Sequence, residues 1–211
     1  MAATEKDLRD RTLLMLWSKS AQKVEFTFDG IYFTGAYFSI VSMAIVLKAT
    51  VSWGVGFRTG QVAADADAQY DPADNVIDVP NYSYGTTTGD RDSIVHECFH
   101  AWRDAVGAKA PTATGSVATT ALTDEAMAYL VGALFTNYDT TPAGSAVTLP
   151  YWATAGTIYA EAHRIAASLM GVKSPVVSAA DVTTLKDKIK ASPTYRALKA
   201  TPTMSYGNNG L

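Results

Sequence analysis

Cysteine and histidine are both scarce in this 211-residue chain, which contains one cysteine, Cys98, and three histidines. A single cysteine cannot form an intramolecular disulfide, and it cannot supply the thiolates of a four-cysteine zinc module. The sequence therefore excludes a disulfide-stabilised scaffold. Any metal ion would have to be bound by histidine and carboxylate side chains.

Charge is also scarce, and its two signs nearly balance. Charged residues make up 18% of the chain, and 20 acidic residues against 17 basic ones give a formal net charge of -3. Binding to nucleic acid requires a basic surface that neutralises phosphates, so no nucleic-acid partner is expected. Because 48% of the residues are hydrophobic, the chain can bury a core, which excludes general disorder. We expect a single domain over residues 1–211.

The N-terminus lacks the pattern of a secretory signal. Its charged residues precede only the short apolar run Leu13–Trp17, whereas a signal needs a longer uncharged segment. Thr4, with Asp7 three residues later, has the spacing of a capping box and predicts an amphipathic helix within residues 1–22. The protein is expected in the cytoplasm, or exported by a route that leaves no such signal.

Long hydrophobic runs are nearly absent, and the one exception is the charge-free segment Gly30–Leu47. Its length reaches the lower limit for a membrane span. Glycine, serine and threonine residues dilute its hydrophobicity, and no basic cluster flanks it. A buried helix or a pair of strands is therefore favoured. A membrane-active protein that uses residues 30–47 is the less favoured alternative.

The remaining pattern predicts an α+β protein, with a small sheet in the first half and mainly helices in the second. Short strands are expected at 55–57, 68–70 and 76–79. Helices are expected from the N-cap Asp90 to about 107, over 124–137 after Thr123, over 152–170, and over 178–191 after a cap by Ser178 and Asp181. A loop at 107–122, a short helix that starts at Ser192-Pro193 and a frayed tail at 204–211 complete the prediction.

The motif HExxH, formed by His96, Glu97 and His100, lies inside the predicted helix 90–107. Residues four apart on a helix project from one face about one turn apart, so both imidazoles can bind the same ion. Glu97 lies beside them in the position of a general base. Cys98 falls on the opposite, apolar face of the helix and is assigned to the core.

A third metal ligand is expected, because catalytic zinc usually has three protein ligands. The best candidate is Glu125, in the first turn of the predicted helix 124–137. Its neighbour Asp124 is an alternative ligand, and either acid could instead only complement the helix dipole. Asp104 lies one turn beyond His100, so contact with a ligand or a surface ion pair is more plausible for it than direct binding.

The segment Val76–Tyr138 resembles the gluzincin, or thermolysin-like, branch of zincin metallopeptidases, in which HExxH on one helix is joined by a glutamate on the next. The resemblance implies a zincin-like fold with a small mixed sheet packed on the HExxH helix. It also implies one Zn²⁺ ion held by His96, His100 and Glu125, with Glu97 activating water. The sequence departs from the family's second motif at Asp124 and Tyr129, where that motif has asparagine and aspartate.

Two further features of the site follow from the same resemblance. Thermolysin-like enzymes stabilise the oxyanion with a downstream histidine or tyrosine, for which His163 and Tyr129 are the candidates. Alternatively, both of these residues have only packing roles. The strand at 76–79 occupies the place of the sheet edge beside a zincin cleft, which would put Asn81 and Tyr82 at its border. Alternatively, it is an ordinary edge strand ended by Pro80.

The function that these residues predict is that of a zinc-dependent peptidase, most plausibly an endopeptidase, whose partner is a peptide or protein substrate. The alternative is a metal-stabilised binding or structural domain without turnover. An intact Glu97 favours the enzyme, because a purely structural metal site does not need a general base.

Overall fold

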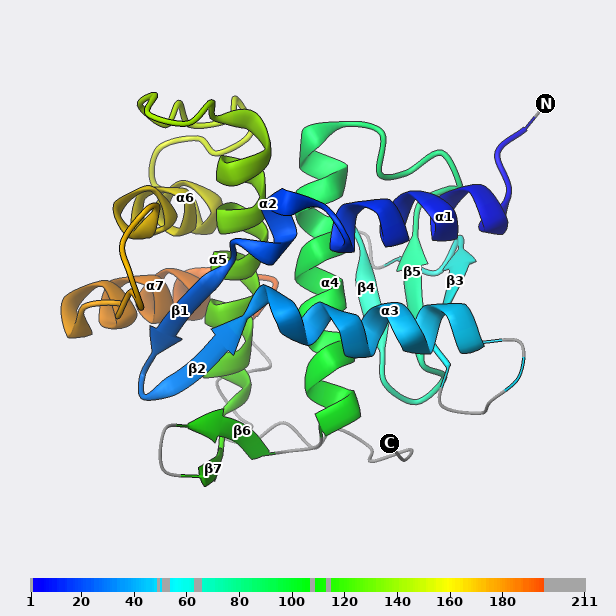
Figure 1. Ribbon diagram of the computed structural model, residues 1–211, viewed down its shortest axis with the longest axis horizontal. Coiled ribbons are helices and arrows are strands. Elements are labelled where there is room, and N and C mark those ends of the chain that lie inside the picture. Colours follow the sequence, from blue (N-terminus) through cyan, green and yellow to red (C-terminus); the bar gives the residue numbers. More distant parts are fainter. Residues whose placement is uncertain are drawn as a thin grey trace.

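The computed structural model describes residues 2–48, 50, 54–62, 66–106, 109–112 and 115–195. It is an α+β protein, as predicted, with seven α-helices and three small sheets in the described residues (Figure 1). The helices are α1 (Glu5–Leu16), α2 (Lys19–Gln22), α3 (Phe38–Leu47), α4 (Thr88–Val106), α5 (Ala121–Thr140), α6 (Ile158–Leu169) and α7 (Ala179–Ala191), and a 3-10 turn spans Gly35–Tyr37. The strands are β1 (Glu25–Phe28), β2 (Ile31–Thr34), β3 (Gly56–Thr59), β4 (Gln69–Asp71), β5 (Val76–Val79), β6 (Lys109–Thr112) and β7 (Gly115–Ala118).

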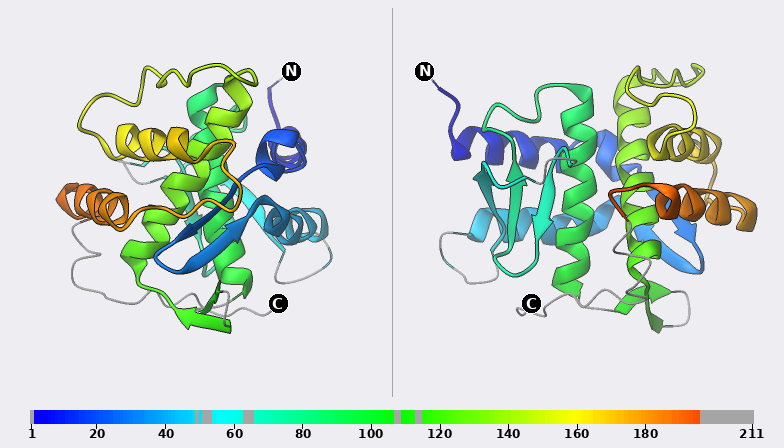
Figure 2. Two further views of the ribbon diagram at one scale, coloured as in Figure 1. Left: turned by 60° about the vertical axis from the view of Figure 1, so that its left-hand side comes forward. Right: turned by 180° about the vertical axis from the view of Figure 1, so that it is seen from behind.

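Helices α4 and α5 form the centre of the molecule and run side by side in all the views (Figures 1 and 2). Most residues of both helices are buried, because other elements cover them on several sides. Gly132 permits the close approach: a Cβ atom at this position would lie 2.6 Å from Asp92 Oδ1 and 2.9 Å from the Asp92 carbonyl oxygen. The packing of α5 on α4 therefore depends on a residue without a side chain.

The β1–β2 hairpin joins the centre through aromatic packing. Its turn residues Asp29 and Gly30 both have positive φ, as tight hairpin turns require. The Phe33 ring on β2 lies 5.3 Å from that of Phe99 and 5.0 Å from that of Trp102, measured between ring centroids. Because both partners belong to α4, this cluster fixes the hairpin on that helix.

A small mixed sheet packs against α4, as predicted. Its strand order is β3-β5-β4, with β3 parallel and β4 antiparallel to β5. Arg58 on β3 binds Asp71 at 3.1 Å and Asp78 at 2.7 Å, and so links all three strands through their side chains. The strand order makes β5 the central strand and not the expected sheet edge. The edge that approaches the HExxH residues is β4.

The predicted N-terminal helix over residues 1–22 is two helices in the structure. The capping box of Thr4 and Asp7 is present at the start of α1. The helix ends at Leu16, and Ser18 caps the separate short helix α2. Ser18 has extended backbone angles, which interrupt the helical hydrogen bonding between the two segments.

Residues 30–47 form neither a single buried helix nor a pair of strands. They contain the strand β2, the 3-10 turn and helix α3 in succession. Gly35 begins the 3-10 turn, and a Cβ atom there would lie 1.9 Å from the Ala21 carbonyl oxygen, so the backbone packs too closely at this point for a side chain. Among the described helices, none combines the length and the apolar character needed to cross a membrane.

Several predicted boundaries in the second half are wrong. Helix α4 begins at Thr88, and Asp90 is not its N-cap: the Asp90 carboxylate accepts from the Thr87 N–H while Thr87 Oγ1 accepts from the Asp90 N–H. The predicted loop 107–122 contains the hairpin β6–β7. Helix α5 begins at Ala121 after the N-cap Thr120, three residues before the predicted start.

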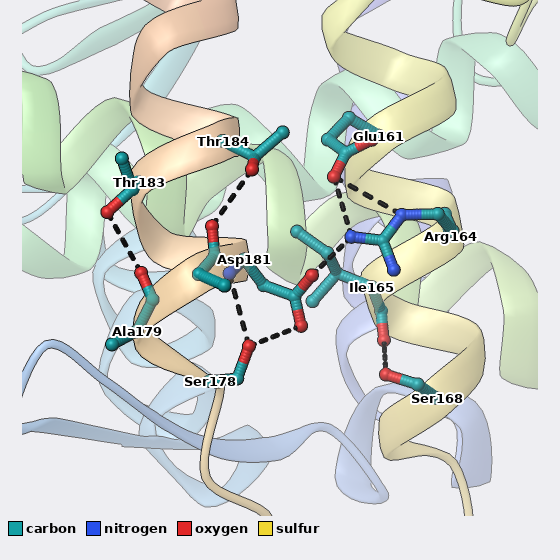
Figure 3. A network of polar contacts seen from close by, with 10 residues as sticks. Glu161, Arg164, Ile165, Ser168, Ser178, Ala179, Asp181, Thr183 and Thr184 are labelled. Atoms are coloured by element: carbon teal, nitrogen blue, oxygen red, sulfur yellow. Dashed lines mark hydrogen bonds and ion pairs between the residues drawn. The ribbon is translucent and has the colours of Figure 1, made fainter.

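The C-terminal helices also differ in part from the prediction. Helix α6 begins at Ile158, later than expected, after the N-cap Thr157. The Ser178 cap of α7 is present, and Figure 3 shows how Asp181 in its first turn also binds Arg164 of α6, which in turn binds Glu161. Residues 192–195 are not helical, and the rest of the expected last helix and the tail at 204–211 lie outside the described residues.

Replacing Gly132 by alanine tests the close approach of α4 and α5. The added methyl group would overlap Asp92 backbone and side-chain atoms, so Gly132→Ala should lower the free energy of unfolding by roughly 1–3 kcal/mol, despite the better helix propensity of alanine. The control is Gly89→Ala in α4, where a Cβ atom would meet only Trp152 ring atoms at 3.6 Å or more. Chemical denaturation would measure both, and equal stabilities of the two variants would contradict the packing argument.

Candidate metal centre

Three of the predicted ligands, His96, His100 and Glu125, come together in the structure as a buried cluster that could hold a metal ion. The Nε2 atoms of the two histidines are 3.2 Å apart. Glu125 places one carboxylate oxygen 3.5 Å from His96 Nε2 and the other 3.4 Å from His100 Nε2. The histidines project from successive turns of α4, and Glu125 lies in the first turns of α5.

The charges in this cluster depend on one another. Burial lowers the pKa of His100, but the adjacent Glu125 carboxylate outweighs that effect and raises it to about 9. Burial raises the pKa of Glu125, but His100 and His96 bring it below its usual range. Without an ion, the acid is thus stabilised by its histidine neighbours. A metal ion would replace the protons that these groups share.

Glu97 is held at the edge of the cluster by a contact that the sequence does not predict. One of its carboxylate oxygens accepts a 2.7 Å hydrogen bond from the backbone N–H of Tyr70 on β4. The other oxygen lies 3.8 Å from His96 Nε2. Burial raises the pKa of Glu97, against the opposing effect of the two histidines. The carboxylate is therefore oriented, and its affinity for a proton is increased.

Tyr70 is anchored to α4 at a second point. Its hydroxyl donates a 2.8 Å hydrogen bond to Asp104 Oδ2, and lies 3.0 Å from Asn75 Oδ1. Asp104 is buried, so the prediction of a surface ion pair is wrong. Its partner is the residue whose backbone holds Glu97, which makes Asp104 a support for the cluster rather than a ligand.

Asp124, the alternative ligand, does not face the cluster. It is fully buried and accepts a 3.1 Å hydrogen bond from Arg103 Nε, which is also fully buried. Arg103 lies on α4 three residues after His100, and Asp124 lies on α5 one residue before Glu125. Their ion pair therefore joins α4 to the start of α5. It therefore fixes the position of the Glu125 backbone relative to the histidines.

His163 is not part of the cluster and does not line the cavity described below. Its side chain is fully buried, with Nδ1 at 2.8 Å from Asn137 Oδ1 and Nε2 at 3.2 Å from Asp92 Oδ2. The Asp92 carboxylate also accepts from the Thr136 hydroxyl. This network joins α4, α5 and α6 in the interior. The structure thus places His163 in a packing role, the alternative considered from the sequence.

Tyr129, the other candidate for oxyanion stabilisation, lies at the site. Its ring is 4.6 Å from that of His96, and its hydroxyl is 2.9 Å from the hydroxyl of Tyr195. Burial raises the pKa of Tyr129, so the hydroxyl keeps its proton and can donate it in a hydrogen bond. The sequence does not single out Tyr195, because it lies far along the chain and no motif marks it.

A cavity of about 450 Å³ opens beside His96 and Glu97. One wall is the segment 66–68, which leads into β4, and the other comes from residues 156–159 and from the end of α7. The expected border residues Asn81 and Tyr82 do not line it; the carbonyl of Tyr82 instead accepts from Arg11. The physical reason is that β5 is the central strand, so the residues that follow it lie away from the free edge.

Cys98 occupies the core, as predicted. It is fully buried on α4, and burial raises the pKa of its thiol. It is therefore a packed, unreactive side chain and not a metal ligand.

Comparisons of the chain with protein-family models, with curated proteins and with solved structures gave no match. The geometry of the site is therefore the basis for any functional conclusion.

The Arg103–Asp124 pair gives a test of how the two helices are held together. Asp124→Leu should lower the free energy of unfolding by roughly 3–5 kcal/mol, because it leaves the buried Arg103 without its carboxylate. The double variant Arg103→Leu/Asp124→Leu should recover much of that loss, since both members of the buried ion pair are then replaced by apolar side chains. Chemical denaturation of the single and double variants would measure the coupling. Losses that simply add would show that the two residues are energetically independent.

Proposed function

We propose that the protein is a zinc-dependent peptidase with a zincin-like arrangement, in which His96, His100 and Glu125 bind one Zn²⁺ ion. The observation that carries the proposal is the spacing of the donor atoms. In a tetrahedral zinc site with bonds of about 2.0–2.1 Å, neighbouring donors are about 3.3 Å apart. The two Nε2 atoms are 3.2 Å apart, and each lies 3.4–3.5 Å from a different oxygen of Glu125, while one donor atom from each residue lies within 4.8 Å of the others, so a small movement of the carboxylate would bring three donors to this spacing.

The type and number of donors also favour a catalytic site over a structural one. Two imidazoles and one carboxylate are the ligand set of known catalytic zinc sites, which leave a fourth position open. One buried oxygen of Glu125, Oε2, has no hydrogen-bond partner among the described residues. A cation at this place would satisfy it, and the adjacent cavity gives a substrate access.

The ion would act as a Lewis acid on the scissile carbonyl and would lower the pKa of water. Glu97 would take a proton from the attacking water and deliver it to the leaving amine. Its hydrogen bond from the Tyr70 N–H leaves one carboxylate oxygen for this task. Tyr129, paired with Tyr195, would donate a hydrogen bond to the carbonyl oxygen as negative charge develops there.

The arrangement of the elements supports the zincin-like part of the proposal. A small mixed sheet with an antiparallel edge strand packs on the HExxH helix, and the third ligand comes from the following helix. This is the order that the resemblance to gluzincins implies. A structural site without turnover explains the metal ligands equally well, but it gives no role to an oriented Glu97 beside a cavity.

Hydrolysis of an unfolded protein substrate by the zinc-loaded chain is the direct test. Glu97→Gln should lower kcat by about 10²- to 10⁴-fold, because the general base is lost, while elemental analysis still finds one zinc per chain. The matched control is Glu25→Gln on β1. The Glu25 carboxylate accepts a hydrogen bond from the Tyr32 hydroxyl and does not line the cavity. Hydrolysis that resists a chelator, or full activity of the Glu97→Gln variant, would contradict the proposal. Stoichiometric zinc with no hydrolysis would favour a structural site.

Removing the Tyr129 hydroxyl tests its role separately. Tyr129→Phe keeps the ring against His96 and should lower kcat by about 10²- to 10³-fold with little change in KM, because the lost hydrogen bond acts in the transition state. Tyr138→Phe on the same helix is the control, since that hydroxyl contacts only the Gly171 N–H among the described residues. A KM effect without a kcat effect would instead assign Tyr129 to substrate binding.

A further inference from the structure

Three tyrosine rings, from Tyr129, Tyr159 and Tyr195, line the cavity beside the metal centre. The rings of Tyr129 and Tyr159 have centroids 5.2 Å apart and planes at 82°. Those of Tyr129 and Tyr195 are 6.1 Å apart at 77°. Burial raises the pKa of the Tyr159 and Tyr195 hydroxyls, so these two rings remain neutral. Neutral aromatic rings set at right angles form walls that attract cations.

A carboxylate lines the same cavity beside these rings. Asp67 belongs to the segment that leads into β4, and its Oδ2 accepts a 3.3 Å hydrogen bond from the Tyr159 hydroxyl. This is its one hydrogen bond in the described part of the chain, where no lysine, arginine or histidine lies within ion-pair distance of it. The long bond to a neutral hydroxyl leaves most of the acceptor capacity of Asp67 for a ligand.

The other carboxylate that lines the cavity has a partner already. Glu97 accepts a hydrogen bond from the Tyr70 N–H, whereas Glu125 faces the two histidines and does not line the cavity. Lys188 also lines the cavity; its ammonium group donates a 3.0 Å hydrogen bond to the Gly156 carbonyl oxygen and keeps its positive charge, but in the described part of the chain it forms no ion pair with Asp67. Asp67 is therefore the carboxylate whose charge is open to the cavity.

We propose that this cleft selects peptides with a basic side chain, and that the Lys or Arg of the substrate binds between Asp67 and the tyrosine rings. The long apolar part of such a side chain would lie against the rings, and its cationic end would replace Tyr159 as the partner of Asp67. The inference rests on the proposed function in one respect, namely that the occupant of the cleft is a peptide.

Binding to the zinc-loaded Glu97→Gln variant tests this selectivity without turnover. The probes are two short unstructured peptide sets that are identical except that one carries a lysine at each successive position and the other carries norleucine, which has a similar length and no charge. Calorimetry should give at least one lysine peptide a Kd about 3- to 30-fold lower than its norleucine counterpart. This is the size expected for an ion pair with an exposed carboxylate together with a contact between the cation and an aromatic ring.

Asp67→Asn in the same Glu97→Gln background should reduce that ratio to about one. The substitution preserves the shape of the side chain and its hydrogen bond from Tyr159, and Asp67 is exposed, so folding should not change. Asp10→Asn on α1 removes the same charge far from the cavity and should keep the lysine preference.

The outcomes separate this inference from the proposed function. Equal binding of both peptide sets, a preference that survives Asp67→Asn, or no binding of either set would overturn the selectivity, whereas cleavage by the unsubstituted chain would still support a peptidase. A lysine preference that Asp67→Asn removes would establish the selectivity. If the unsubstituted chain then failed to cleave these peptides, only the proposed function would be overturned.

Discussion

The close contact between α4 and α5 is the constraint on which the rest of the structure depends. The two histidines lie on α4 and the glutamate on α5, so their donor atoms can converge only if the two helix backbones approach closely. Gly132 allows that approach, because its missing side chain leaves room for Asp92. The buried Arg103–Asp124 pair then fixes how far α5 is displaced along α4. Glu125, one residue from Asp124, is positioned as a consequence.

Such a centre concentrates buried charge, which is unfavourable unless each group has a partner. In this protein the carboxylates around α4 are each matched separately: Asp92 by Thr136 and His163, Glu97 by the Tyr70 backbone, Asp104 by the Tyr70 hydroxyl, Asp124 by Arg103, and Glu125 by His96 and His100. The network gives a role in the core to a histidine that lies outside the candidate metal cluster. His163 stabilises the helix packing that the cluster requires.

The sequence predicts those parts of the structure that follow from local geometry. The joint orientation of His96 and His100 follows from helical periodicity, and the capping box at Thr4 follows from neighbouring residues. Glu125 is a candidate from its place on the next predicted helix and from the resemblance, but its distance from the histidines depends on helix packing, which the sequence does not predict. The role of His163 could not be predicted, because a buried histidine looks the same in sequence whichever partner it meets. The position of Tyr195 beside Tyr129 depends on how the segment after α7 packs at the cavity, which no local sequence pattern predicts.

Tyr70 connects the β4 side of the cavity to the candidate general base Glu97. The backbone N–H of Tyr70 holds Glu97, and its hydroxyl binds Asp104 on the same helix. Tyr70 therefore attaches β4 to α4 at two points. The segment that carries Asp67 leads directly into this strand, so Asp67 and the backbone group that orients Glu97 belong to one continuous stretch of chain. The wall proposed to bind a basic side chain and the contact that orients the candidate base are thus parts of one structural unit, whereas the three candidate metal ligands are held by the α4–α5 contact.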